Sequence, residues 1–138
     1  MKAFLFHNFG NMGIITIENQ NLKVEIKSKG AELSSLLDKA DGLEHMWRAD
    51  SKYWPRHAPI LFPCVGESKD GKVSINGIDY PMGRHGFARQ EEFTLTESDV
   101  DHATFKLKAN ASTRKHYPFD FALKVSYRLD GRLSLIHI

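Results

Sequence analysis

The segment YPMGRHGFARQEEF, which begins at Tyr80, places Arg84, His85 and Arg89 close together around two glycines. The glycines allow backbone conformations that are closed to other residues and let a ligand approach the main chain. An imidazole can donate, accept or transfer a proton near neutral pH, and planar guanidinium groups suit hydroxyl pairs, carboxylates and phosphates. Phe87 is expected to anchor this loop in the core. The segment therefore predicts a polar binding or proton-transfer site, and the structural alternative is a polar turn between two strands.

A second polar pair, Arg56 and His57, stands between two prolines in the segment WPRHAPILFPCVG. Prolines make a loop rigid and keep it out of a central strand. Rigid loops on a stable scaffold commonly carry binding groups. Arg56 is therefore a candidate for ligand contact, with two solvated loop residues as the alternative interpretation.

The elements that would position these loops are strands. In NLKVEIK (21–27) the three aliphatic residues alternate with charged ones, and EFTLTES, ATFKLKA and FALKVSYRL repeat this period of two. Asn76-Gly77 separates two β-prone runs and predicts a hairpin with a type I′ turn. One helical turn is expected at 50–54. The pattern predicts an all-β fold, an antiparallel sandwich or barrel.

Composition limits the functional classes. The chain has 138 residues, of which 41% are hydrophobic, so one modest domain is expected. Its 19 Lys and Arg and 17 Asp and Glu are interspersed, which argues against a nucleic-acid-binding face. No apolar run approaches the ~20 residues of a membrane span. The lone Cys64 reads as a buried thiol, and we predict a cytoplasmic protein that does not bind membranes.

The remaining histidines show no spacing that would gather metal ligands, so no metal site is predicted. They are His7, His45, His57, His102, His116 and His137.

Both ends of the chain differ in character from the middle. Residues 1–12 read as a non-native upstream extension, with Met12 as the expected initiator. The final LSLIHI (133–138) matches the in-frame translation of a transposon end sequence used in preparing sequencing libraries, and we interpret it as a tail of that origin. A genuine final strand is the alternative. The domain proper is thus expected to span 13–132.

The run YWPRHAPILFPCVGESKDGKVSINGIDYPMGRHGFARQEEF resembles the aldose 1-epimerase (mutarotase) family, in its LacX-like branch. The aromatic-Pro-Arg-His-Ala-Pro run, LFP.VG, the KDG turn and HGFAR carry the resemblance. NLKVEIKSKGAELSSLLDK upstream and YPFDFALKVSYRL downstream extend it over about residues 13 to 132. The linked LFP and HGFAR motifs are far more specific together than either is alone.

The resemblance implies a galactose mutarotase-like fold, an antiparallel β-supersandwich whose concave face binds a sugar. It implies an isomerase that interconverts the α and β anomers of an aldohexose without metal or organic cofactor. His85 would be the catalytic histidine near the ring oxygen, with Arg89, Arg56 and Arg84 as substrate-binding candidates. The family's second histidine and carboxylate base come from a later part of the chain. This sequence therefore corresponds to the N-terminal part of the fold, and by itself it is expected to be inactive.

Two further functions remain open on the same residues. A hexose-phosphate mutarotase would use Arg84, Arg89 and Arg56 to clamp a phosphate. A carbohydrate-binding protein without catalysis would stack sugar on aromatic side chains such as Trp54 and Tyr80.

Overall fold

The computed structural model describes residues 13–138, and the predicted upstream extension at 1–12 lies outside the described residues. The described residues form nine strands and three short 3-10 helices. The strands are β1 (Ile14–Glu18), β2 (Leu22–Lys27), β3 (Glu32–Asp38), β4 (Lys72–Ile75), β5 (Ile78–Pro81), β6 (Thr94–Ser98), β7 (His102–Lys108), β8 (Ala122–Asp130) and β9 (Leu133–His137). The 3-10 helices are η1 (Lys69–Gly71), η2 (Ala88–Gln90) and η3 (Thr113–Lys115).

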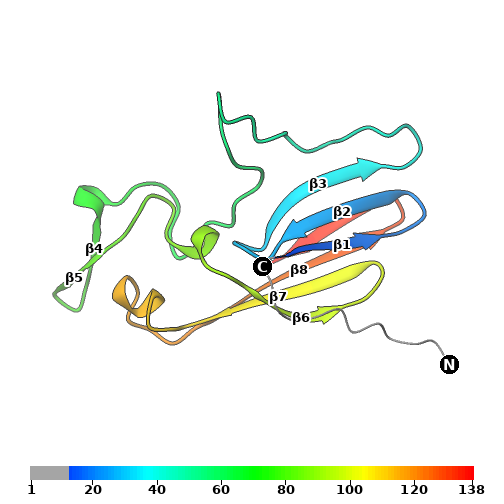
Figure 1. Ribbon diagram of the computed structural model, residues 1–138. Coiled ribbons are helices and arrows are strands. Elements are labelled where there is room, and N and C mark those ends of the chain that lie inside the picture. The colour runs from blue at the N-terminus through cyan, green and yellow to red at the C-terminus, as the bar shows by residue number, and fades with distance from the viewer. Residues whose placement is uncertain (1–12) are drawn as a thin grey trace.

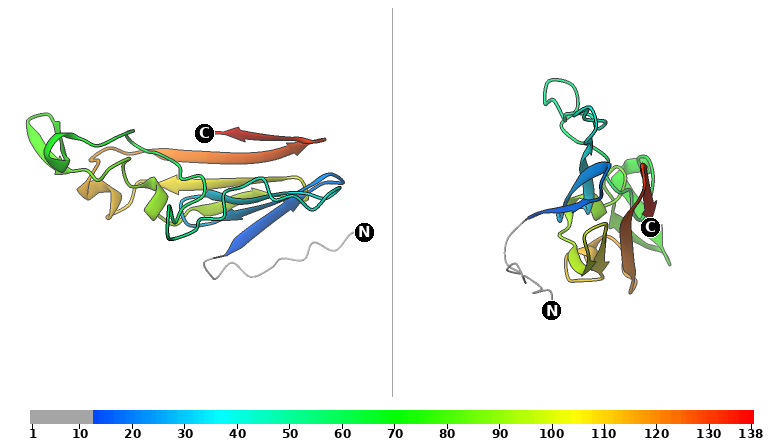
Figure 2. Two further views of the ribbon diagram at one scale, coloured as in Figure 1. Left: turned by 90° about the horizontal axis from the view of Figure 1, so that it is seen from above. Right: turned by 90° about the vertical axis from the view of Figure 1, so that its right-hand side faces the viewer.

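The strands form two larger antiparallel sheets and one separate hairpin. One sheet has the order β1-β2-β3, the other β6-β7-β8-β9, and β4 pairs with β5 alone. The two larger sheets lie face to face, while the hairpin extends from one end of them (Figures 1 and 2). The predicted all-β antiparallel architecture is confirmed.

The core fills the space between the two larger sheets. Val24 and Ile26 of β2 and Phe105 and Val125 of β7 and β8 have no exposed surface. Their polar neighbours along each strand face outward, as the period of two requires. The aliphatic residues of the alternation predicted for 21–27 therefore form the buried face of β2.

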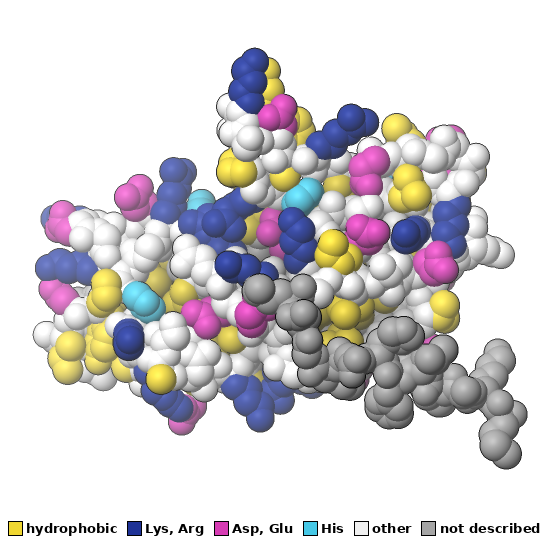
Figure 3. All heavy atoms as spheres, in the orientation of Figure 1, with side chains coloured by type: hydrophobic (Ala, Val, Ile, Leu, Met, Phe, Trp, Pro, Cys, Tyr) yellow, Lys and Arg dark blue, Asp and Glu magenta, His cyan; other side chains and the backbone are white. Residues whose placement is uncertain are grey.

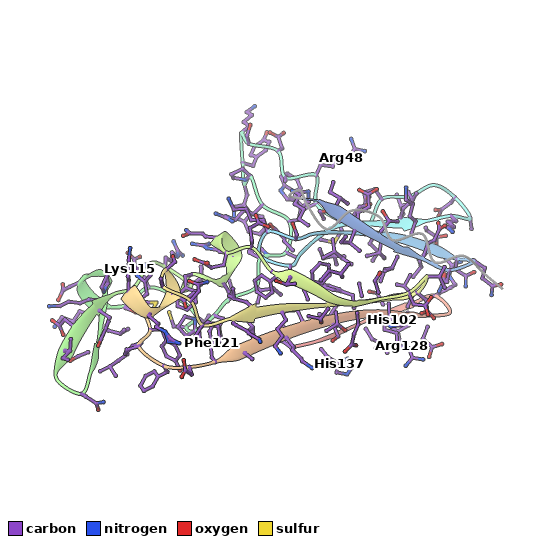
Figure 4. The ribbon with its side chains drawn as sticks, turned by 60° about the horizontal axis from the view of Figure 1, so that its bottom comes forward. Arg48, His102, Lys115, Phe121, Arg128 and His137 are labelled. Atoms are coloured by element: carbon purple, nitrogen blue, oxygen red, sulfur yellow. The ribbon has the colours of Figure 1, made fainter. Side chains whose placement is uncertain are left out.

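The outward face of the second sheet is polar. His102 of β7 lies directly opposite Arg128 of β8, and His137 of β9 lies opposite Ser126. Figure 4 labels three of these side chains, His102, Arg128 and His137, on their neighbouring strands.

Local turn chemistry explains the connections. Asn76 and Gly77 have φ angles of 51° and 78°, the two positive values of a type I′ turn, so the predicted hairpin is confirmed. At 50–54 the chain makes a single turn, in which Asp50 Oδ1 accepts a hydrogen bond from the Lys52 amide at 2.9 Å. It ends before Pro55 and does not continue as a helix.

An aromatic cluster joins the loops that carry the LFP and HGFAR motifs to the two larger sheets. The ring of Phe62 lies 5.9 Å from Phe87, 6.0 Å from Tyr117 and 5.1 Å from Phe121, measured between centroids. Phe87 is buried, as predicted, and Phe121 precedes β8 (Figure 4). Aromatic packing of this kind fixes the ends of loops that have no regular structure of their own. Cys64, predicted as a buried thiol, is instead partly exposed at the edge of the core.

The end of the chain packs on the sandwich in this structure. β9 pairs with β8 through Asp130↔Leu133 to Ser126↔His137. In the turn before β9, Arg132 forms an ion pair with the buried Asp38 of β3. The origin of residues 133–138 and the domain limits at 13 and 132 stay predictions. No helix within residues 13–138 has the length and apolar character to cross a bilayer.

Candidate active site

The LFP and HGFAR motifs are paired through their backbones. Phe62 and Gly86 form a parallel bridge, and the amides of Phe87 and Ala88 both donate to the Phe62 carbonyl oxygen, at 2.9 and 3.2 Å. Gly86 has a φ of 74°, and a Cβ atom there would lie 2.0 Å from the Phe62 carbonyl oxygen. The position therefore excludes every side chain, which explains why a glycine follows the histidine.

His85 is fixed by Gly66, the glycine that ends the CVG segment. The His85 amide donates to the Gly66 carbonyl at 2.7 Å, and the Gly66 amide donates to His85 Nδ1 at 2.9 Å. Because an amide N–H can only donate, Nδ1 accepts, and the neutral ring carries its proton on Nε2. The backbone of His85 has a φ of 67°, a left-handed conformation that histidine adopts more readily than most residues. The ring is thus held with a donor nitrogen facing away from Gly66.

Arg89 lies in η2, five residues after Arg84. Its Nη2 donates to the Arg84 carbonyl oxygen at 2.7 Å, and its side chain is partly buried. Burial lowers the pKa of Arg89 below its ordinary range, and the positive charges of Arg56 and Arg84 lower it further. Arg84 and Arg89 are joined by this hydrogen bond, and Arg56 is near enough for its charge to act on Arg89, so we call these three residues the arginine cluster.

The arginine cluster has unused hydrogen-bonding capacity. Within residues 13–138, Nε of Arg89 and Nδ1 of His57 are buried and have no hydrogen-bond partner. The ion pairs among the described residues include none of the three arginines. In Figure 3 basic side chains gather beside a histidine near the middle of the face shown, with acidic side chains close to them. Buried polar atoms without partners are uncommon, and positive groups without a carboxylate suit a polar or anionic ligand.

The structure thus brings Arg56, Arg84 and Arg89 together, with His85 on the same short loop. Their roles toward a substrate stay predictions. The sequence interpretation missed Gly66 as the residue that orients the imidazole, although it ends the LFP.VG motif. Of the two glycines around His85, Gly86 has a positive φ and Gly83 does not, because His85 itself takes the second left-handed conformation.

Comparison with known proteins places these motifs in a family. The family model described as aldose 1-epimerase matches residues 13–138. The chromosomal protein LacX of Lactococcus lactis subsp. lactis is 42% identical over 123 residues, which cover 86% of this chain and 41% of LacX.

Two solved structures have the same fold. A galactose mutarotase-like protein from Lactobacillus casei is 44% identical with a TM-score of 0.84, covering 86% of this chain and 40% of that one. A galactose mutarotase related enzyme from Lactobacillus acidophilus is 42% identical with a TM-score of 0.84, covering 86% and 39%. The predicted galactose mutarotase-like fold is confirmed, and the chain spans about two fifths of the length of these relatives. Because the family model matches residues 13–138, this chain belongs to the aldose 1-epimerase family.

Proposed function

We propose that a protein continuing this chain over the length of its relatives is an aldose 1-epimerase, which interconverts the α and β anomers of an aldohexose. Family membership supports an isomerase acting on a sugar. The observation that carries the proposal is the Gly66–His85 pair, which directs the protonated Nε2 of a neutral imidazole away from the loop.

The reaction needs two proton transfers. A base removes the proton of the anomeric hydroxyl while an acid protonates the ring oxygen, so the C1–O5 bond breaks and the aldehyde forms. Rotation about C1–C2 and the reverse transfers close the ring with the opposite configuration. His85 would donate its Nε2 proton to the ring oxygen, and the arginine cluster would hold hydroxyl groups. The carboxylate base and second histidine, as the family resemblance implies, belong to a later part of the protein.

Anomer exchange measured by NMR tests this proposal. We expect the full-length protein to accelerate exchange between α- and β-galactose or glucose well above the buffer rate. The 138-residue chain alone is expected to add no measurable exchange, because the family resemblance assigns the base to a later part of the protein. Acceleration by the chain alone would place a base within it, whereas binding of sugar by the full-length protein without acceleration would mark a carbohydrate-binding protein instead.

A hexose phosphate is a second candidate substrate, and the arginine cluster favours it. Three guanidinium groups lie close enough for Arg56 and Arg84 to lower the pKa of Arg89, with no carboxylate paired to them among the described residues. A phosphate would relieve this repulsion and accept several charge-assisted hydrogen bonds.

Comparing glucose with glucose 6-phosphate separates the two substrates. If the arginine cluster binds phosphate, exchange of glucose 6-phosphate is expected to have the higher kcat/KM, and the advantage should shrink as NaCl screens the charges. Equal efficiency for both sugars at low salt would assign the arginine cluster to hydroxyl groups.

A further inference from the structure

Glu32, the first residue of β3, has a buried carboxylate with a distinctive set of partners. The residue is 7% exposed, and it forms no ion pair within the described part of the chain. Its Oε1 accepts hydrogen bonds from the amides of His57 and Ala58, at 2.8 and 3.1 Å. A buried carboxylate requires such donors, because its desolvation would otherwise be strongly unfavourable.

These two amides follow Arg56 directly in the WPRHAP loop. Ala58 also forms an antiparallel bridge with Leu33. The loop is therefore attached to the start of β3 both by this bridge and by the Glu32 side chain. Pro55 and Pro59, on either side of residues 56–58, have no backbone N–H. The Glu32 carboxylate therefore accepts from two of the few amides in this loop. The backbone from which the Arg56 side chain leaves is therefore fixed by Glu32.

The turn that leads into Glu32 also contacts the HGFAR loop. The Gly30 amide donates to the Glu91 carbonyl at 2.8 Å, and a Cβ atom at Gly30 would lie 3.0 Å from the Arg89 carbonyl oxygen. Tyr127 of the second sheet donates from its hydroxyl to the Ala31 carbonyl at 2.6 Å, which anchors the turn in the core. The turn thus contacts the backbone at Arg89, and Glu32, which follows the turn, contacts the backbone next to Arg56.

We propose that Glu32 is the positioning residue of the arginine cluster: by fixing the 57–58 backbone, it holds Arg56 beside Arg89 against their mutual repulsion. Like charges repel each other, most strongly where solvent does not screen them, so a restraint on the backbone next to Arg56 opposes its displacement from Arg89. Glu32 does not neutralise the arginines, because its carboxylate accepts backbone amides. The proposal holds whichever sugar the site binds.

Three variants of the 138-residue chain test it. Glu32→Ala removes the acceptor, whereas Glu32→Gln keeps an oxygen of the same reach without the charge. Asp38→Ala is the matched control, because Asp38 is the buried carboxylate at the opposite end of β3 and is paired with Arg132. It removes a buried acid from the same strand without touching the WPRHAP loop.

Amide hydrogen exchange of ¹⁵N-labelled chains gives the first measurement. We expect Glu32→Ala to accelerate exchange of the His57 and Ala58 amides by about tenfold or more relative to the β2 amides. Glu32→Gln should restore most of the protection, and Asp38→Ala should not affect these two amides selectively. Unchanged exchange in Glu32→Ala, or an equal effect of Asp38→Ala, would overturn the proposal.

Titration with inorganic phosphate, followed through the Nε–Hε resonances of Arg56 and Arg89, gives the second measurement. Glu32→Ala should weaken phosphate binding by about tenfold, with recovery in Glu32→Gln and wild-type affinity in Asp38→Ala. Equal affinity in wild type and Glu32→Ala would contradict the positioning role. If the wild-type chain does not bind phosphate, the anion function fails, and the exchange measurement alone decides the role of Glu32.

Discussion

Replacing His85 with alanine in the full-length protein is expected to slow anomer exchange by roughly 10²–10⁴-fold, the usual contribution of a positioned general acid or base. The variant removes the Nε2 donor, while the Gly66 carbonyl keeps its hydrogen bond from the residue 85 amide. Because proton transfer occurs in the transition state, kcat and kcat/KM should fall together. Saturation-transfer NMR on galactose measures both.

The matched control is His116→Ala. His116 packs on Phe87, with ring centroids 6.2 Å apart, and its Nδ1 lies 2.7 Å from the Pro81 carbonyl oxygen. Losing this ring disturbs the packing beneath the HGFAR loop but removes no group from the proposed reaction. Near-normal exchange in His85→Ala, or an equal loss in both variants, would make His85 a structural residue.

Replacing Gly86 with alanine is expected to destabilise the fold by more than about 4 kcal/mol, which is exceptional for a single substitution. The added Cβ would lie 2.0 Å from the Phe62 carbonyl oxygen, 2.4 Å from its carbonyl carbon and 2.6 Å from the Pro63 nitrogen. All three are backbone atoms, so relief requires the two motif loops to separate. Urea unfolding followed by Trp fluorescence measures the loss.

Gly77→Ala is the control that separates the effect of the clash from the effect of the left-handed backbone conformation. Gly77 has a similar φ of 78°, but no atom lies within 4 Å of its would-be Cβ. Its substitution should cost about 1–2 kcal/mol, the ordinary penalty for a left-handed residue with a side chain. If both alanine variants lost the same stability, the close approach of Phe62 to Gly86 would not be the cause.

Local sequence patterns predicted most of the architecture. The alternation in NLKVEIK places Val24 and Ile26 in the core, and Asn76-Gly77 forms the expected type I′ turn. Both features depend only on residues that are close together in the chain, so a single sequence reveals them.

The supports of the candidate site are long-range and were not predictable from local patterns. Glu32 contacts the 57–58 amides across 25 residues of chain, and Gly66 contacts His85 across 19. Nothing local distinguishes Glu32 from a solvent-facing residue at the start of a strand. Cys64 shows the same limit, because apolar neighbours predicted burial while the fold leaves the thiol partly exposed.

The β4–β5 hairpin lies between Gly66 and His85 in the chain. Two sets of backbone hydrogen bonds hold its two ends together. Gly66 and His85 are joined at 2.7 Å, and the Met82 amide donates to the Gly71 carbonyl at 2.8 Å. Changes at the tip are therefore mechanically isolated from the imidazole. Asn76-Gly77 is therefore a suitable insertion point for a reporter dye or a peptide tag. Homologues could likewise have longer or shorter β4–β5 hairpins without a change at His85.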